Sequence, residues 1–204
     1  RNSSSAADAS LKNRAALTVG AVQAWFSMRL ISWLSILSLV VMLSGCGEPA
    51  ADVAVSKKHH KDGLEVQHPG NWKVTETVVE EGFHHMMVET PGDAVVIVQV
   101  FPAEGAATLK EYADAFSAAA AEEAPFGVVS KSKFVELDPK EGWSRTKETF
   151  IIQVLGVKVE HTRLYHTRDF GHWRCFVLCQ TADEDWAKVE PGFSQIVSSV
   201  SIAK

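Results

Sequence analysis

Apolar and polar positions alternate in short segments along most of the chain after residue 63, a pattern that predicts β-strands buried on one face. Clusters of Gly, Pro, Asn and Asp separate these segments and mark turns. Ala94–Phe101 is apolar at nearly every position, which predicts a central strand covered on both faces. The other strands are expected at 64–68, 72–79, 83–89, 128–136, 143–154, 157–168 and 172–179. Only short turns separate the last three, which predicts an antiparallel meander.

The spacing of apolar residues changes to a helical period after residue 108. Thr108 and Glu111 form a capping box, in which the hydroxyl and the carboxylate satisfy free amides of the first turn. Apolar residues then recur three and four positions apart, which predicts a helix with one buried face. These residues are Leu109, Tyr112, Ala113, Phe116 and Ala120, and Pro125 and Gly127 end the helix.

A second helical region closes the chain. Thr181–Glu184 reads as another capping box, and Glu190–Pro191 is expected to break the helix that follows it. A final amphipathic helix begins at Pro191 and carries Phe193, Ile196, Val197 and Val200. The order of strands, helix, strands and helix predicts an α+β domain over residues 63–204, with helices covering a mainly antiparallel sheet. The expected core includes Trp72, Phe116, Trp186 and Phe193.

The segment Gly63–Trp72 resembles the opening of the PsbP-like families, in which a short strand is followed by Pro-Gly and a Trp. The closing pattern of Trp186, Phe193, Ile196 and Val200 is similar to theirs as well. The resemblance implies an α-β-α sandwich. It also implies a role in binding, because these families include a photosystem accessory protein, a Ran-binding nuclear import factor and bacterial lipoproteins. A shared fold does not transfer a partner.

An apolar run from Leu30 to Leu43 follows Met28-Arg29 and ends in Leu43-Ser44-Gly45-Cys46. These four residues resemble the lipobox of bacterial lipoproteins, which implies diacylglyceryl transfer to the Cys46 thiol and cleavage just before it. Residues 28–45 are then a signal peptide, and residues 1–27 are an upstream extension. The alternative is an uncleaved transmembrane helix, but the run is shorter than the roughly 20 residues that a membrane span needs.

Residues 46–62 are expected to be a lipidated cysteine followed by a flexible tether. The basic run from Lys57 to Lys61 is either a solvated part of this tether or a segment that lies on an anionic membrane. The anchor places the domain in the cell envelope, facing the periplasm. Gly47 offers no acidic retention signal next to Cys46, which favours the outer membrane.

Candidate metal ligands occur together in His84, His85, Met86 and Met87, whose imidazole and thioether groups suit copper. Alternation along a strand leaves only one His and one Met on each face, so another segment would have to complete a site. The other interpretation is a half-buried strand with Met in the core. No cofactor is expected.

Two cysteines remain after lipidation, Cys175 and Cys179, and they lie four residues apart on one predicted strand. That spacing puts their Cα atoms about 13 Å apart, too far for a disulfide, so both are expected to be buried thiols. His172 is at an odd offset from Cys175 and should face away from it. His161 and His166 fall on opposite faces of a strand that we expect to be polar and partly exposed.

The predicted hairpin from residue 163 to 174 offers side chains of the kind that anchor protein interfaces. The candidate anchors are Arg163, Tyr165, Arg168, Phe170 and Trp173. They either bind a protein partner or only pack the hairpin. The formal net charge of −5 argues against nucleic acid as the partner, since phosphates require a basic surface.

Fold-building features are strong and site-building features are weak, so the sequence predicts a membrane-anchored envelope protein that binds and does not catalyse. The alternatives are an envelope binder of a small ligand or of copper or zinc, or a hydrolase with a pocket between sheet and helix. A pocket in which His, Cys and acidic groups converge would favour these alternatives.

Replacing Cys46 by Ser removes the thiol that is expected to carry the lipid. The Cys46→Ser protein should incorporate no palmitate and should leave the membrane fraction, because stable anchoring takes two acyl chains or an equivalent second signal. Fractionation of cells grown with labelled palmitate measures both effects. A Ser variant that stays with membranes after a high-salt wash would show that the anchor hypothesis is wrong.

Overall fold

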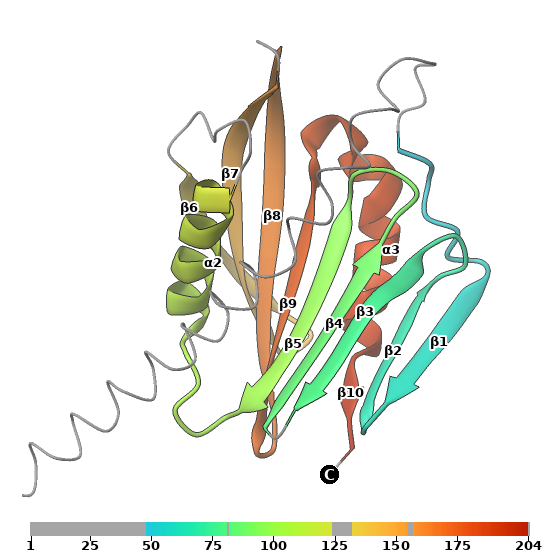
Figure 1. Ribbon diagram of the computed structural model, residues 1–204, viewed down its shortest axis with the longest axis vertical. Coiled ribbons are helices and arrows are strands. Elements are labelled where there is room, and N and C mark those ends of the chain that lie inside the picture. Colours follow the sequence, from blue (N-terminus) through green and yellow to red (C-terminus); the bar gives the residue numbers. More distant parts are fainter. Residues whose placement is uncertain (1–47, 81, 124–131, 155–156, 204) are drawn as a thin grey trace, which may run out of the picture.

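A curved antiparallel sheet forms the body in the computed structural model, which describes residues 48–203 apart from 81, 124–131 and 155–156 (Figure 1). Its strand order is β3-β4-β5-β9-β8-β7-β6. In sequence order these strands are β3 (Lys73–Glu80), β4 (Phe83–Glu89), β5 (Val95–Pro102), β6 (Lys133–Lys140), β7 (Trp143–Val154), β8 (Val157–Phe170) and β9 (Trp173–Ala182). The expected meander is β7-β8-β9, and the apolar strand β5 lies in the interior of the sheet.

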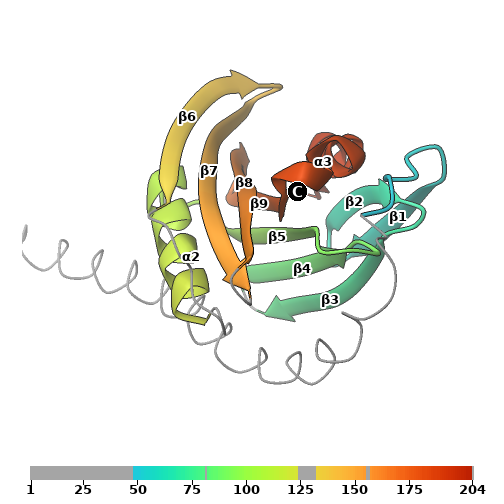
Figure 2. The same ribbon diagram turned by 90° about the horizontal axis from the view of Figure 1, so that it is seen from above.

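Two helices cover opposite faces of this sheet. α2 (Leu109–Glu123) lies on the outer side of the curved sheet, and α3 (Trp186–Ser199) lies in its hollow (Figure 2). The α+β class and the α-β-α layering expected from the sequence are therefore confirmed. The lipobox residues 43–46 and the signal and upstream segments lie outside the described residues.

The α3 face of the sheet holds the larger apolar core. Val96, Val98 and Val100 of β5 pack there with the inward residues of β9 and with Phe193 and Ile196 of α3. Trp72 is 1% exposed and packs edge-on against Phe193, with ring centroids 5.6 Å apart. Its close approach depends on Gly192, where a Cβ would lie 2.5 Å from the Trp72 ring. The helix and Trp72 thus fix each other's position.

The α2 face holds a second, more aromatic core. Tyr112 and Phe116 of α2 pack on Tyr165 and Phe176, and the rings of Tyr112 and Phe176 stack at 4.1 Å. The predicted capping box begins the helix, because the Thr108 amide donates to the Glu111 carboxylate (2.8 Å) and the Glu111 amide donates to the Thr108 hydroxyl (3.3 Å). Of the four residues expected in the core, only Trp186 is half-buried.

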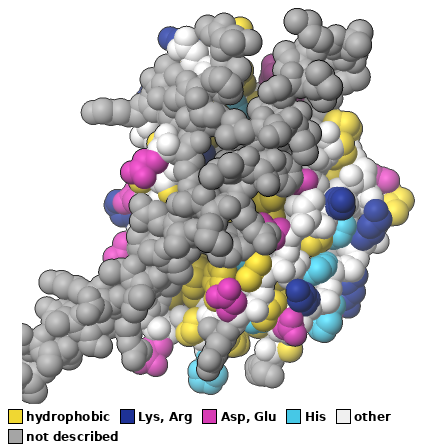
Figure 3. Space-filling model, viewed as in Figure 1, with side chains coloured by type: hydrophobic (Ala, Val, Ile, Leu, Met, Phe, Trp, Pro, Cys, Tyr) yellow, Lys and Arg dark blue, Asp and Glu magenta, His cyan; other side chains and the backbone are white. Residues whose placement is uncertain are grey.

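The flexible tether expected over residues 46–62 differs from the structure. Ser56–Lys61 forms β1, which pairs antiparallel with β2 (Leu64–Pro69), and β10 (Ser201–Ile202) pairs with the other edge of β2. The ordered domain therefore begins well before residue 63. Lys and His side chains gather over this small sheet (Figure 3). Pairing with β2 and contacts across the chain, which no local pattern reveals, hold this polar segment in place.

The start of α3 also differs from the expectation. Thr181 is the penultimate residue of β9 and is buried, so its hydroxyl does not cap a helix. The 3₁₀ turn Asp183–Asp185 follows, and α3 begins at Trp186 without a side-chain cap. The expected second capping box is wrong because residues 181 and 182 continue the ladder with β8 instead.

The break expected at Glu190–Pro191 is wrong as well, since α3 runs without interruption from Trp186 to Ser199. Pro191 is the sixth residue of the helix, where it removes one backbone hydrogen bond and its ring crowds the carbonyl four residues earlier, at a cost of about 3 kcal/mol. Burial of Val189, Phe193 and Ile196 along one face outweighs that loss, since each large apolar side chain contributes about 1.5–3 kcal/mol.

Phe116→Ala tests whether α2 is held by its aromatic face. Phe116 is 4% exposed, and truncation of a buried Phe costs about 3–5 kcal/mol. The variant should melt well over 5 °C below the wild type, since 1 kcal/mol shifts the midpoint of a domain of this size by about 2–4 °C. Thermal unfolding followed by circular dichroism measures the shift, and a fall of less than about 2 °C would place Phe116 outside the core.

Candidate functional site

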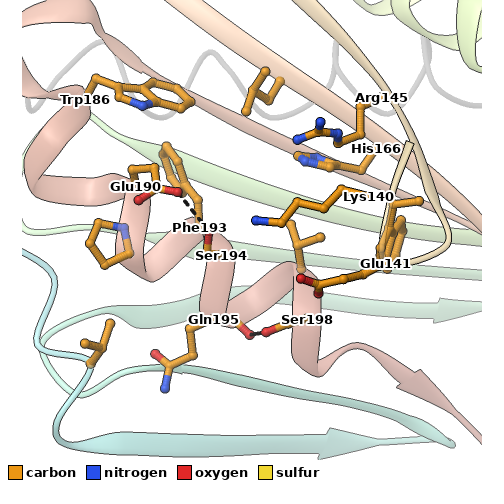
Figure 4. A pocket seen from close by; sticks show the side chains of 15 residues that line it. Lys140, Glu141, Arg145, His166, Trp186, Glu190, Phe193, Ser194, Gln195 and Ser198 are labelled. Atoms are coloured by element: carbon orange, nitrogen blue, oxygen red, sulfur yellow. Dashed lines mark hydrogen bonds between the residues drawn. The ribbon is translucent and has the colours of Figure 1, made fainter. Parts of the chain in front are cut away.

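A groove of about 300 Å³ runs between α3 and the part of the sheet formed by β7 and β8 (Figure 4). It exists because α3 packs against β2 and β9, whereas the sheet curves away from the helix on the β7 and β8 side (Figure 2). The turn between β6 and β7 closes one end of the groove, and Val53 lines it from the segment before β1. Its volume is at the lower end of the range for small-molecule sites.

The walls of the groove are largely apolar. Trp143 of β7 and Leu164 of β8 form one side, and Phe193 and Val197 of α3 form the other. Trp186 lies at the amino-terminal end of α3 with its ring 5.7 Å from that of Phe193. These aromatic surfaces suit the apolar part of a small ligand.

Polar groups converge at the end of the groove near the β6–β7 turn. Figure 4 shows three basic side chains there, Lys140, Arg145 and His166, with the carboxylate of Glu141 beside Lys140. Glu190 lies near Trp186 at the other end. The Arg145 guanidinium donates to the Asp138 carbonyl through Nε (2.9 Å) and Nη2 (2.7 Å), which holds its charge in place. In the described part of the chain the Lys140 ammonium has no carboxylate within ion-pair distance.

His166 presents a neutral imidazole to the groove. Burial is the main cause that lowers its pKa to about 4, and the positive charges of Arg145 and Lys140 lower it further. Its Nδ1 lies 3.3 Å from the Val177 carbonyl, which can only accept, so Nδ1 carries the proton. Nε2 is then a hydrogen-bond acceptor. The strand expected to be polar and partly exposed is thus buried at His166.

Two of the five predicted partner anchors are buried beneath α2. Arg163 and Tyr165 both reach Glu148 of β7, which is 0% exposed. Tyr165 Oη donates to Glu148 Oε2 (2.6 Å), and Arg163 Nη1 donates to the same oxygen (3.2 Å). Neither side chain can therefore anchor a protein partner from the surface.

Glu148 is a buried carboxylate that no pattern in the sequence singled out. Its other carboxylate oxygen accepts from the hydroxyls of Ser117 (2.6 Å) and Ser132, so both oxygens are satisfied. A buried carboxylate with full hydrogen bonding and an Arg partner is a structural element, because removal of one partner leaves a buried charge uncompensated. Its polar neighbours leave it no room to act on a substrate.

The other three predicted anchors lie together near the β8–β9 turn. Arg168 is exposed and lies over the Phe170 ring, 5.0 Å from its centroid. Trp173 pairs with Phe170 across the turn and packs edge-on against His84 at 5.8 Å. Arg168, Phe170 and Trp173 remain accessible or half-buried, so the hairpin end keeps part of the predicted set.

The four candidate metal ligands of β4 are divided between the two faces. Met86 is buried in the α3 core, and Met87 packs against the α2 core. His85 is buried and accepts from the Gln99 amide at 3.1 Å, while Tyr112 Oη donates to the Gln99 carbonyl at 2.7 Å. Among the described residues no three His, Cys, Asp or Glu side chains gather to hold a metal ion.

Cys175 and Cys179 are free and buried, as predicted. Both face the α3 core, where burial raises the pKa of each thiol far above its ordinary value. A thiol held in its neutral form is a poor nucleophile.

Within the described ranges no helix is both long and apolar enough to span a bilayer.

Comparison with known proteins yields likeness of fold only. No family model and no curated protein matches the chain. Cyanobacterial PsbP from Synechocystis sp. PCC 6803 is similar, with 13% identity, a TM-score of 0.44, and coverage of 80% of this chain and 99% of that one. LpqN of Mycobacterium tuberculosis, described as involved in cell envelope biogenesis, has 10% identity and a TM-score of 0.39, over 74% of this chain and 91% of its own. Neither likeness says what this chain binds or does.

The buried histidines His85 and His166 should make stability depend on pH. Burial is the cause that lowers the pKa of His85 and the main cause that lowers that of His166, each to about 4 from 6.5, so between these pH values the unfolded chain binds more protons. The contribution of each histidine to the free energy of unfolding should therefore be constant above about pH 6.5. It should fall by roughly 3 kcal/mol for each group as the pH drops toward 4.

Urea unfolding at several pH values measures this dependence. The double variant His85→Gln, His166→Gln should lose much of the slope between about pH 6.5 and 4, whatever its stability at neutral pH. An unchanged slope in the double variant would show that other groups cause the dependence.

Proposed function

We propose that this protein is a lipid-anchored binding protein of the cell envelope that holds a small anionic amphiphile in the groove between α3 and β7–β8. The anchor is the lipid expected on Cys46, and it faces the domain toward the periplasm. The ligand's apolar part would lie against Trp143, Phe193 and Trp186, and its anionic group near Lys140.

The observation that carries this proposal is the Lys140 ammonium at the end of an apolar groove, which forms no ion pair with the residues that the structure describes. Arg145 adds a second fixed positive charge, and neutral His166 adds an acceptor. Glu141 and Glu190 also line the groove, so its total charge is small. Glu141 lies at the same end as Lys140 and Arg145, where two positive charges outnumber its one carboxylate, and Glu190 lies near Trp186 at the other end, so an anionic group is favoured near Lys140 and Arg145 (Figure 4).

Binding without turnover is supported by the positions of the reactive groups. The thiol of Cys175 is buried away from water and held in its neutral form, and Glu148 is occupied by four hydrogen-bond donors on the other face of the sheet. His166 has a basic nitrogen, but a general base needs a reacting group within hydrogen-bond reach and a partner that stabilises the charge it gains. Arg145 and Lys140 oppose that charge.

A protein partner is a second proposal, confined to the hairpin end formed by Arg168, Phe170 and Trp173. The observation in its favour is the exposed guanidinium of Arg168 over the Phe170 ring. Double substitution of Arg168 and Phe170, followed by comparison of what is captured from membranes, addresses this surface separately from the groove.

Three eight-carbon probes test the groove: octanoate, octanol and octylamine. Octanoate should bind with the highest affinity, and its binding should change the fluorescence of Trp143 and Trp186. Lys140→Ala should weaken octanoate about fivefold, which corresponds to the roughly 1 kcal/mol expected of an exposed charge interaction, and should leave octanol unaffected.

Lys158→Ala is the matched control, since Lys158 is an exposed strand residue outside the groove. It removes the same charge and should bind octanoate as the wild type does. Equal affinity for all three probes, or an equal loss in both lysine variants, would contradict an anion-selective groove.

A further inference from the structure

The segment Glu48–Val55, here called the amino-terminal clamp, is fastened to the body at its first residue. Glu48 is 5% exposed, and its carboxylate accepts from the backbone amides of Gly92 and Ala94, each at 3.3 Å. A Cβ at Gly92 would lie 2.0 Å from a Glu48 oxygen, so only glycine leaves room for the carboxylate. Glu48 thereby binds the first residue of the clamp to the β4–β5 turn.

Hydrogen bonds to the β2–β3 turn and to α3 also hold the clamp. The Asn71 side chain in the β2–β3 turn accepts from the Asp52 amide and donates to the Ala50 carbonyl, each at 2.9 Å. The Ala51 amide donates to the Lys188 carbonyl of α3, also at 2.9 Å. Two turns and one helix therefore fix the clamp at the same end of the sheet.

This arrangement leaves almost no free chain between the body and the expected lipid. Only Gly47 separates Cys46 from Glu48, and two residues span at most about 7 Å. A lipid on Cys46 lies in the bilayer, so the clamped end of the body must lie at the bilayer surface.

We infer that the amino-terminal clamp sets the body directly on the membrane, with the β4–β5 and β2–β3 turns toward the lipid and the β8–β9 turn away from it. The partner of this end is a phospholipid bilayer. The inference rests on the lipid anchor of the proposed function. The antiparallel pairing of β5 with β9 puts the two ends of the body apart by the length of β5, about 26 Å for 8 residues.

The same orientation bears on the groove. Val53 of the clamp and Trp186 line its membrane-facing end. Lys140 is the last residue of β6 and lies near the opposite end, because it precedes Ser144, which pairs with Thr167. The groove then runs from the bilayer outward, with its aromatic end toward the lipid and its cationic end away from it. An amphiphile entering from the membrane would keep its orientation, with its tail toward the bilayer and its anionic group pointing outward.

Proteolytic release tests whether the clamp is closed. The full chain, produced and lipidated in a bacterial host and reconstituted in phosphatidylcholine vesicles, should release its body to elastase slowly, because the Ala- and Val-rich clamp is cleaved only when it opens. Glu48→Ala and Gly92→Ala should release it at least about tenfold faster. Asp93→Ala, which removes a charge from the same turn without touching the clamp, should behave as the wild type.

Energy transfer to the bilayer tests the orientation. A donor dye is attached at Asp93→Cys, beside the clamp, or at His172→Cys, in the β8–β9 turn, and acceptors are placed on lipid headgroups. The buried Cys175 and Cys179 do not react in the folded chain. Transfer should be at least about twofold more efficient from position 93, given the roughly 26 Å between the ends. Glu48→Ala should reduce this difference.

The outcomes separate this inference from the anchor itself. A chain that carries no lipid, or a Cys46→Ser variant that stays in the membrane, removes the anchor and the inference with it. A lipidated chain that gives equal transfer from both positions, or release rates that do not respond to Glu48→Ala, keeps the anchor and overturns the clamp.

Discussion

The antiparallel pairing of β5 with β9 is the constraint on which the rest of the structure depends. Val98 and Val177 face each other on the α3 side, and Ile97 and Leu178 face each other on the α2 side, and all four are buried. A strand pair that is apolar on both faces must be covered on both, which places α2 and α3 on opposite sides of the sheet. Because α3 covers only the centre, the curved strands β7 and β8 leave the groove beside it.

The local sequence predicted the elements whose start, end and buried face are determined by their own residues and adjoining turns. The capping box of Thr108 and Glu111 begins α2, and the bounds of β4 and β7 follow from turns and alternation. The segment from Glu48 to Lys61 was not predictable, because its contacts join it to residues far along the chain. Thr181 shows the converse: its sequence fits a helix cap, but pairing of β9 with β8 takes precedence.

The candidate sites depended even more on strand register. Arg163 and Tyr165 look like surface anchors in the sequence, and only the pairing of Glu148 with Arg163 across β7 and β8 reveals that they neutralise a buried carboxylate. The groove joins the β6–β7 turn, β8 and α3, and no spacing along the chain brings these segments together. Its basic and aromatic residues are each unremarkable until the sheet curves around the helix.

The basic strand β1 has a consequence for self-association. It is an outer strand of its sheet, and such an edge exposes unpaired amides and carbonyls that can bind another copy of the same strand. The three lysines of this strand, Lys57, Lys58 and Lys61, would then lie beside the equally basic strand of the second copy, and like charges close to each other destabilise a strand pair. These charges make the segment look like a linker in the sequence. In the structure they oppose aggregation through the exposed edge of β1 when the protein is at high concentration.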